Sequence, residues 1–190
     1  LFKVKEKFKN HNYELSSNNT EDIKQNILND ICDIGFISGK PNDDSFNYYK
    51  VGTDKIVLTA SQQYDIDDEI DTVELMKHPM ILLTGEIHIE EALKENIDNL
   101  GHKSEELNIL FNLNSVEAVK ASIQQGYGIS FLSYQTVKQE IYKKQLKLVD
   151  FKDFNLDYDV YLIMKKDSSG SEIVKEFVQY FKKIGNNSFC

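Results

Sequence analysis

Three short polar stretches of the sequence follow apolar, strand-like runs and open helix-like segments. The N-terminus of a helix presents free backbone N–H groups and a positive dipole, which suit an anion or a small polar molecule. In open α/β sheets, ligands bind at the carboxyl ends of strands beside such helix starts. Hydroxyl and amide side chains there could bind a ligand, but the same residue types are ordinary helix caps, so both roles stay open. The side chains concerned are Ser17, Asn19, Thr20, Thr84, Asn114 and Ser115.

The stretch NSVEAVKASIQQGYGISFLS, residues 114–133, contains a Gly-x-Gly sequence. A phosphate-binding loop requires a strand, then a glycine-rich turn, then the start of a helix. Here the order is reversed, because a helix-like run precedes the glycines and an apolar run follows them. We therefore expect Gly126 to end a helix in the left-handed conformation. The tight turn after it would let the backbone approach a ligand.

Metal and catalytic motifs find little support. The acidic run YDIDDEIDTVE, residues 64–74, has Ile70 where a calcium loop needs glycine. The four histidines lack zinc-ligand spacing, and a histidine acting as general base would need a carboxylate or nucleophile placed beside it. No G-x-S-x-G sequence is present. The sequence predicts no metal, no cofactor and no enzymatic activity.

Composition excludes several partners. The 190 residues carry a formal net charge of -9, and all 22 basic residues are lysines. An acidic chain repels phosphate backbones, so we do not expect it to bind nucleic acid by itself. No apolar run reaches the roughly 20 residues of a membrane helix. The two cysteines do not make a disulfide framework, which fits the reducing cytoplasm.

Strand-like and helix-like segments alternate along the chain, which is typical of the α/β class. The apolar strands are continuous rather than alternating, so we expect a mostly parallel sheet covered by helices. The acidic run at 64–74 is expected near a boundary between two lobes. The expected strands are 13–16, 33–38, 55–60, 79–83, 106–113, 128–132, 146–150 and 158–164. The expected helices are 1–8, 21–31, 88–100, 116–125, 134–144 and 171–184.

Six segments together resemble the effector-binding domain of LysR-type transcriptional regulators. They occur in the order of that family and cover nearly the whole chain. The most recognisable is the stretch 114–133, which is similar to the family's "ser-x-glu-ala-ile-lys … gly-x-gly-ile-x-x-leu-ser". The others are SSNNTEDIKQNILNDICDIGFISG, KIVLTAS, TVELMKHPMILL, LKLVDFKDFNLDYDVYLIMKK and EIVKEFVQYFKK.

The resemblance implies a fold like the type 2 periplasmic binding proteins, with two α/β lobes joined by two crossover strands and the effector between them. Residues 1–62 and 152–190 would form lobe I, and residues 63–151 would form lobe II. Asn114, Ser115, Asn19 and Thr20 would face the effector, and Ser61 would lie near the first crossover. The wall of lobe II would include Tyr127, Gly128 and Ile129.

Departures from the family pattern limit this comparison. The winged helix-turn-helix that binds DNA in the family is absent from these residues, and the family's first strand would precede Leu1. The segment PMILLTGEIHIEEAL is shorter than its counterpart, so Thr84 has no residue-by-residue match.

The resemblance implies an effector-sensing domain of a bacterial transcription regulator. It would bind an amino-acid-like or organic-acid effector, form a homodimer or a tetramer when full length, and contact DNA only through the missing N-terminal domain. A solute-binding protein of a transporter, or an enzyme on the same scaffold, would share the fold. A signal peptide upstream would favour the transporter protein, whereas a dedicated acid or base between the lobes would favour the enzyme.

Overall fold

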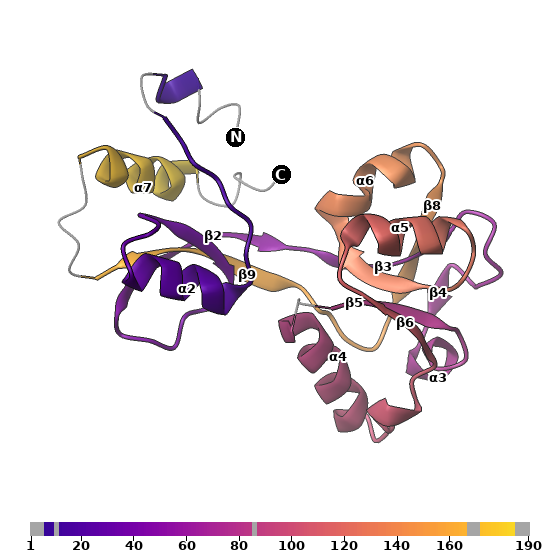
Figure 1. Ribbon diagram of the computed structural model, residues 1–190. Helices are drawn as coiled ribbons and strands as arrows, with labels where there is room; N and C mark the ends of the chain where they lie inside the picture. Colours follow the sequence, from indigo (N-terminus) through magenta and orange to yellow (C-terminus); the bar gives the residue numbers. More distant parts are fainter. Residues whose placement is uncertain (1–5, 10–11, 85–86, 167–171, 185–190) are drawn as a thin grey trace.

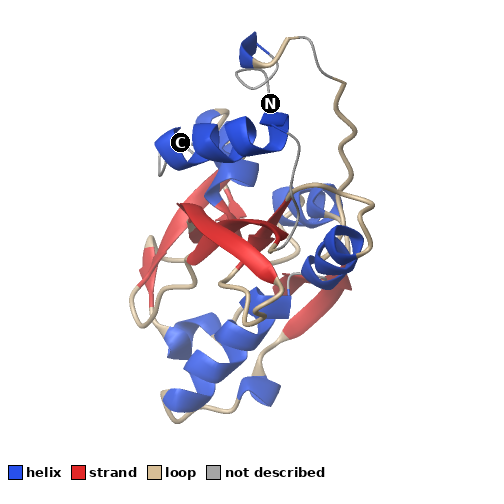
Figure 2. Ribbon diagram, turned by 90° about the vertical axis from the view of Figure 1, so that its left-hand side faces the viewer, coloured by secondary structure: helices blue, strands red, loops and turns tan. Residues whose placement is uncertain are grey.

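The structure is a computed structural model that describes residues 6–9, 12–84, 87–166 and 172–184. Its elements form two separate groups, which lie on the left and on the right of Figure 1 and are joined by long strands. We call the group with β1, β2, β9, α2 and α7 lobe I, and the group with β3 to β8 and α3 to α6 lobe II. Figure 2 shows the strands gathered in the middle of the molecule, with helices around them.

Lobe I is a three-stranded sheet between two helices. The sheet has the order β1-β9-β2, with β1 (Gly35–Ser38) and β2 (Phe46–Asp54) both antiparallel to β9 (Tyr158–Lys165). Successive side chains of a strand point to opposite faces. Val160, Leu162 and Met164 therefore pack under α7 (Glu172–Ile184), while Ile163 packs under α2 (Thr20–Leu28).

Lobe II contains a four-stranded sheet and a two-stranded sheet. The first has the order β4-β8-β3-β7 and the second pairs β5 with β6. A bridge between Met80 and Ile129 links the two sheets. The strands are β3 (Ile56–Ser61), β4 (Glu69–Ile70), β5 (Met80–Leu83), β6 (Ile109–Leu113), β7 (Ser130–Ser133) and β8 (Leu146–Phe151). The helices are α3 (Thr72–Leu75), α4 (Ile87–Asn99), η1 (Ser104–Glu106), α5 (Val116–Gln124) and α6 (Tyr134–Tyr142).

The sequence pattern predicts several elements correctly. On α4, Ile89, Leu93 and Ile97 are buried on one face, as their spacing indicates. Gly126 follows α5 with a φ of 79°, which confirms the predicted left-handed end of that helix. The helix expected over the first residues of the chain, and the predicted helix start at Ser171, fall wholly or partly outside the described residues.

Two predictions about the strands are wrong, and one strand was missed. Residues 13–16 form no strand but lie in an exposed extended segment, because no neighbouring strand pairs with them. β2 was missed, although Phe46, Tyr48 and Val51 are typical strand residues. The sheets are also not mostly parallel. β3 pairs antiparallel with β7 and β8, and only β4–β8, β5–β6 and the Met80–Ile129 bridge are parallel among the described strands.

Two crossovers carry the chain between the lobes. Only Lys55 separates β2 from β3, and residues 152–157 lead from β8 back to β9. The predicted boundary at residue 62 would leave β3 in lobe I, whereas its ladder partners belong to lobe II. We therefore propose that lobe II begins after Lys55. The acidic run at 64–74 then lies within lobe II, since β4 pairs with β8.

Candidate functional site

The carboxyl ends of β5 and β6 meet at one edge of lobe II. The two strands are parallel, and the backbone N–H of Thr84 donates to the carbonyl of Leu113 at 2.7 Å. Asn114 and Ser115 follow immediately, and the Ser115 hydroxyl caps α5 by accepting from the backbone N–H of Ala118 at 3.4 Å. The structure therefore brings Thr84, Asn114 and Ser115 together beside a helix N-terminus, where backbone donors suit a polar or anionic ligand.

β7 ends at the same edge. The backbone N–H of Ile81 donates to the carbonyl of Ile129 at 2.9 Å, so β5 and β7 run side by side in the same direction. Following this register, Ser133 at the end of β7 lies level with Thr84. Ser133 also caps α6, since its hydroxyl accepts from the backbone N–H of Gln135 at 3.2 Å.

Ser133 was missed as a site residue by sequence reasoning, which treated it only as a helix cap. The available signal was its position directly between the apolar run 128–132 and the helix-like run that follows, the same position that singled out Asn114 and Ser115.

The predicted site residues of lobe I lie at the start of α2. Asn19 is its N-cap: the Oδ1 atom accepts from the backbone N–H of Asp22 at 2.9 Å, and the Nδ2 group donates to the Asp22 carboxylate at 2.8 Å. Ser17 and Asn19 are exposed and Thr20 is half-buried. In Figure 1 this end of α2 is the one nearer lobe II. The capping role of Asn19 is thus present, and a ligand role remains compatible with it.

Four other predicted residues are not brought to this edge. Ile129 and Gly128 lie beside Pro79 at the amino end of β5, because the backbone N–H of Ile129 donates to the Pro79 carbonyl at 2.9 Å. Both are buried, while the neighbouring Tyr127 is exposed. Ser61 ends β3 opposite Leu146, so it lies at the far end of that strand from the first crossover. We leave these four residues out of the site that we propose.

A close backbone contact explains why position 128 is a glycine. A Cβ atom at this position would collide with the carbonyl oxygen of Pro79. Only glycine permits the two backbones to come this close. The Gly-x-Gly stretch therefore serves first to end α5 and then to bring the start of β7 against β5.

Two surface cavities lie elsewhere on lobe II. One of about 300 Å³ contains Ser61, Gln62 and Lys144 in its lining, and one of about 520 Å³ lies over α6 between Tyr134 and Tyr142. Neither is lined by Thr84, Asn114 or Ser115.

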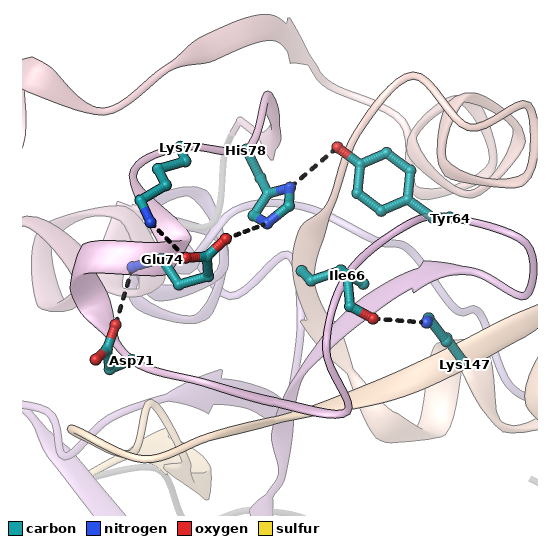
Figure 3. A network of polar contacts seen from close by, with 7 residues as sticks. All are labelled: Tyr64, Ile66, Asp71, Glu74, Lys77, His78 and Lys147. Atoms are coloured by element: carbon teal, nitrogen blue, oxygen red, sulfur yellow. Dashed lines mark hydrogen bonds and ion pairs between the residues drawn. The ribbon is translucent and has the colours of Figure 1, made fainter.

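A polar cluster around His78 has the appearance of a catalytic group (Figure 3). His78 Nδ1 lies 3.3 Å from the Tyr64 hydroxyl, and Nε2 lies 3.4 Å from Glu74, which also pairs with Lys77 at 2.6 Å. The hydrogen bond from Lys77 lowers the pKa of Glu74 and keeps it a carboxylate. The sequence could not show this carboxylate beside a histidine.

The His78 cluster lies just before β5, at the opposite end of that strand from Thr84. Glu74 comes from α3, Lys77 and His78 from the turn after it, and Tyr64 from the segment after β3. The cluster fastens α3 and its turn to the segment after β3. Within the described part of the chain, no group of three or more His, Cys, Asp or Glu side chains could hold a metal ion, and no helix is both long and apolar enough to span a membrane.

Comparison with known proteins identifies the family. The LysR substrate binding domain matches residues 3–185. The chain belongs to this family. This LysR-family chain is 22% identical over 185 residues to the helix-turn-helix-type transcriptional regulator MJ0300 of Methanocaldococcus jannaschii, covering 95% of this chain and 61% of the relative. It is 24% identical to the transcriptional activator CmpR of Synechocystis, covering 87% of this chain and 54% of CmpR.

Solved structures show the same fold, which is that of the type 2 periplasmic binding proteins. The regulatory domain of CcmR from Synechocystis, in complex with 2-PG, has a TM-score of 0.84 at 22% identity and covers 98% of this chain and 89% of that one. The effector binding domain of QuiR, in complex with shikimate, has a TM-score of 0.82 at 16% identity, with coverages of 100% and 88%.

Proposed function

We propose that this chain is the effector-sensing domain of a LysR-type transcription regulator. The observation that supports this most is the convergence of Thr84, Asn114, Ser115 and Ser133 at one edge of lobe II, where β5, β6 and β7 end and where α5 and α6 begin. In open α/β sheets, this edge is where ligands bind. The start of α2, with Ser17, Asn19 and Thr20, would supply the lobe I side of the site. The relatives named above are regulators, which supports this function over that of a transporter protein.

The chemistry of these residues favours an amino-acid-like or organic-acid effector. Hydroxyls, amides and helix N-termini donate hydrogen bonds to carboxylate oxygens without carrying a charge themselves. Since the chain has no arginine, no bidentate guanidinium can grip the acid. Specificity would therefore come from the spacing of these donors.

A binding experiment tests the site. We expect titration calorimetry of this chain with 2-PG, shikimate and a panel of amino and organic acids to find a ligand. Asn114→Ala is expected to weaken the affinity for that ligand about tenfold or more, because a lost hydrogen bond to a charged group costs about 1.5–3 kcal/mol. Asn112→Ala is the matched control, because Asn112 is an exposed amide of β6 outside the site. Equal affinities of the two variants would show that the ligand binds elsewhere.

Regulation would follow from a difference in affinity. A ligand that binds one arrangement of the two lobes more tightly than another shifts the population toward it. The chain spans 54–61% of the length of the two curated relatives described above, so the DNA contact is proposed for a longer protein that includes a DNA-binding domain. We expect this protein to act in the cytoplasm.

A homodimer is also proposed, formed through an edge of each lobe. β6 is the outer strand of the β5–β6 pair, and Ile109, Leu110 and Phe111 are 36–44% exposed on it. In lobe I the extended segment 12–19 exposes Leu15 by 69% and Tyr13 by 40%. An unpaired, apolar edge of this kind can pair with another chain. A second copy of this chain would bring both β6 and the segment 12–19 to the interface.

A further inference from the structure

The start of α6 in lobe II is fastened to the first crossover. The Ser133 hydroxyl donates to Asp54 Oδ1 at 2.7 Å, and the backbone N–H of Tyr134 donates to the Lys55 carbonyl at 2.8 Å. Asp54 is the last residue of β2, which pairs with β9 in lobe I. The first of these bonds therefore joins a side chain of lobe II to a side chain of lobe I. Ser133 is only 9% exposed, so water competes weakly for its hydroxyl.

The same carboxylate also binds the start of β9, where the second crossover ends. The Tyr158 hydroxyl donates to Asp54 Oδ2 at 3.1 Å, and Tyr158 is the ladder partner of Asp54. Next to it, Asp157 Oδ1 accepts from the backbone N–H of Ile56 at 2.8 Å. The end of β2, the start of β9 and the start of α6 thus meet at Asp54, while Asp157 of the second crossover binds the start of β3.

We propose that Asp54 is a latch that fixes the relative orientation of the two lobes through its hydrogen bond with Ser133, while Tyr158 holds the carboxylate in place within lobe I. Rotation of lobe II about the crossovers would move the start of α6 away from the end of β2 and break the Ser133–Asp54 bond. Hydrogen bonds to a charged acceptor are among the stronger ones, so losing one shifts an equilibrium by roughly tenfold or more.

The regulatory meaning of this latch rests on the proposed function. Ser133 lies at the same edge as Thr84 and Asn114, so a ligand bound there would sit beside the latch and favour either its closed or its open state. The latch itself needs no ligand to be measured, and a failed search for an effector leaves its test intact.

The proposal is tested by measuring the distance between the two lobes in solution. Spin labels are placed on exposed positions of α2 and α4 by Gln25→Cys and Glu95→Cys, in a chain carrying Cys32→Ser and Cys190→Ser, and the distance distribution is measured by double electron–electron resonance. We expect Asp54→Ala and Ser133→Ala to broaden the distribution and to populate arrangements that are rare in the parent chain, by roughly tenfold. Ser133→Ala removes the hydroxyl that bonds across the lobes and keeps Asp54, so it decides the result if Asp54→Ala does not fold.

Asp159→Ala is the matched control. Asp159 binds Lys50 at 2.6 Å and Thr53 at 2.9 Å, and all three residues belong to lobe I. This variant removes an aspartate from the same ladder without touching α6, and it is expected to keep the parent distribution. Identical distributions for the parent and the two latch variants would overturn the proposal. So would equal broadening in Asp159→Ala, since any change near the crossovers would then loosen the lobes.

Discussion

Lys120 is a buried lysine that joins α5 to α6 close to the candidate site. Its ammonium donates to Glu140 Oε1 at 3.0 Å and to the Thr136 carbonyl at 3.3 Å, and it pairs with Glu117 at 2.9 Å. The Lys120 and Glu140 side chains are only 10% and 18% exposed. Burial alone would lower the pKa of Lys120, but the hydrogen bonds that its ammonium donates to Glu117 and Glu140 outweigh burial and raise the pKa. The lysine therefore stays charged and holds the two helices that begin at the site.

Removing this charge is expected to destabilise the chain. Lys120→Met leaves Glu140 buried without its partner, and we expect the free energy of unfolding in urea at neutral pH to fall by about 3 kcal/mol. Lys138→Met is the control on the exposed surface of α6, where the change should stay within about 0.5 kcal/mol. Equal effects of the two substitutions would contradict a structural role for Lys120.

The stability that the Lys120–Glu140 pair contributes is expected to depend on pH through Glu140. Burial raises the pKa of Glu140, but the hydrogen bond from Lys120 outweighs it, and the pKa lies below the ordinary value. A lowered pKa in the folded state means that the stabilisation is complete above the unfolded pKa of about 4.3 and is lost as the pH falls through the folded pKa. Unfolding in urea between about pH 3 and about pH 6 should therefore show a shallower loss of stability for Glu140→Gln than for the parent chain. Parallel curves would show that the pair contributes nothing.

Part of the proposed site could be predicted from the sequence. Thr84, Asn114 and Ser115 were singled out because each follows an apolar run and precedes a helix. The prediction also included Tyr127, Gly128 and Ile129 through the family resemblance, whereas the structure puts them at the other end of β5. Periodicity places a residue on an element, but it cannot say at which end of a neighbouring strand that residue will lie.

At the scale of elements, the approach of β7 to β5 depends on Gly128. In Gly128→Ala, the added Cβ must push the Pro79 carbonyl away, which we expect to cost about 1–3 kcal/mol. Gly126→Ala is the contrast. It meets no neighbouring atom but must adopt a positive φ, at a cost of about 1–2 kcal/mol.

Hydrogen exchange separates these two mechanisms. The Ile129 amide is bonded to the Pro79 carbonyl, so its exchange should accelerate in Gly128→Ala beyond what the loss of global stability explains. In Gly126→Ala, the exchange rate of the Ile129 amide should rise only as much as the loss of global stability explains. The same local acceleration in both variants would show that the turn, and not the contact with Pro79, controls this region.

The elements themselves were largely predictable, but their pairing was not. The helices carry a buried stripe that appears in the sequence, as Ile89, Leu93 and Ile97 do on α4. Strand direction depends on partners far along the chain: β3 pairs with β7 and β8, which follow it by many residues. Continuous apolar runs indicate burial on both faces, which antiparallel strands between helices also have. The predicted parallel sheet failed for this reason.

For the whole molecule, the exposed edge of β6 predicts the oligomeric state. Leu110→Lys puts a charge into the proposed dimer edge, and we expect sedimentation equilibrium to show a shift from dimer toward monomer. Leu148→Lys is the matched control, because Leu148 is a strand leucine of similar exposure, 41% against 44%. If the Leu110→Lys variant is still a dimer, the interface lies elsewhere. If the parent chain is already a monomer, the proposed interface does not exist.

The sheet order β1-β9-β2 of lobe I has a consequence for how the protein is made. Its middle strand comes from residues 158–165, after the whole of lobe II has been synthesised. On the ribosome, β1 and β2 emerge before lobe II, yet they pair with β9 and not with each other. Lobe II can fold as soon as β8 has left the exit tunnel, whereas lobe I must wait for the returning strand. Of the two lobes, the one whose translation begins earlier is thus the later to complete its sheet.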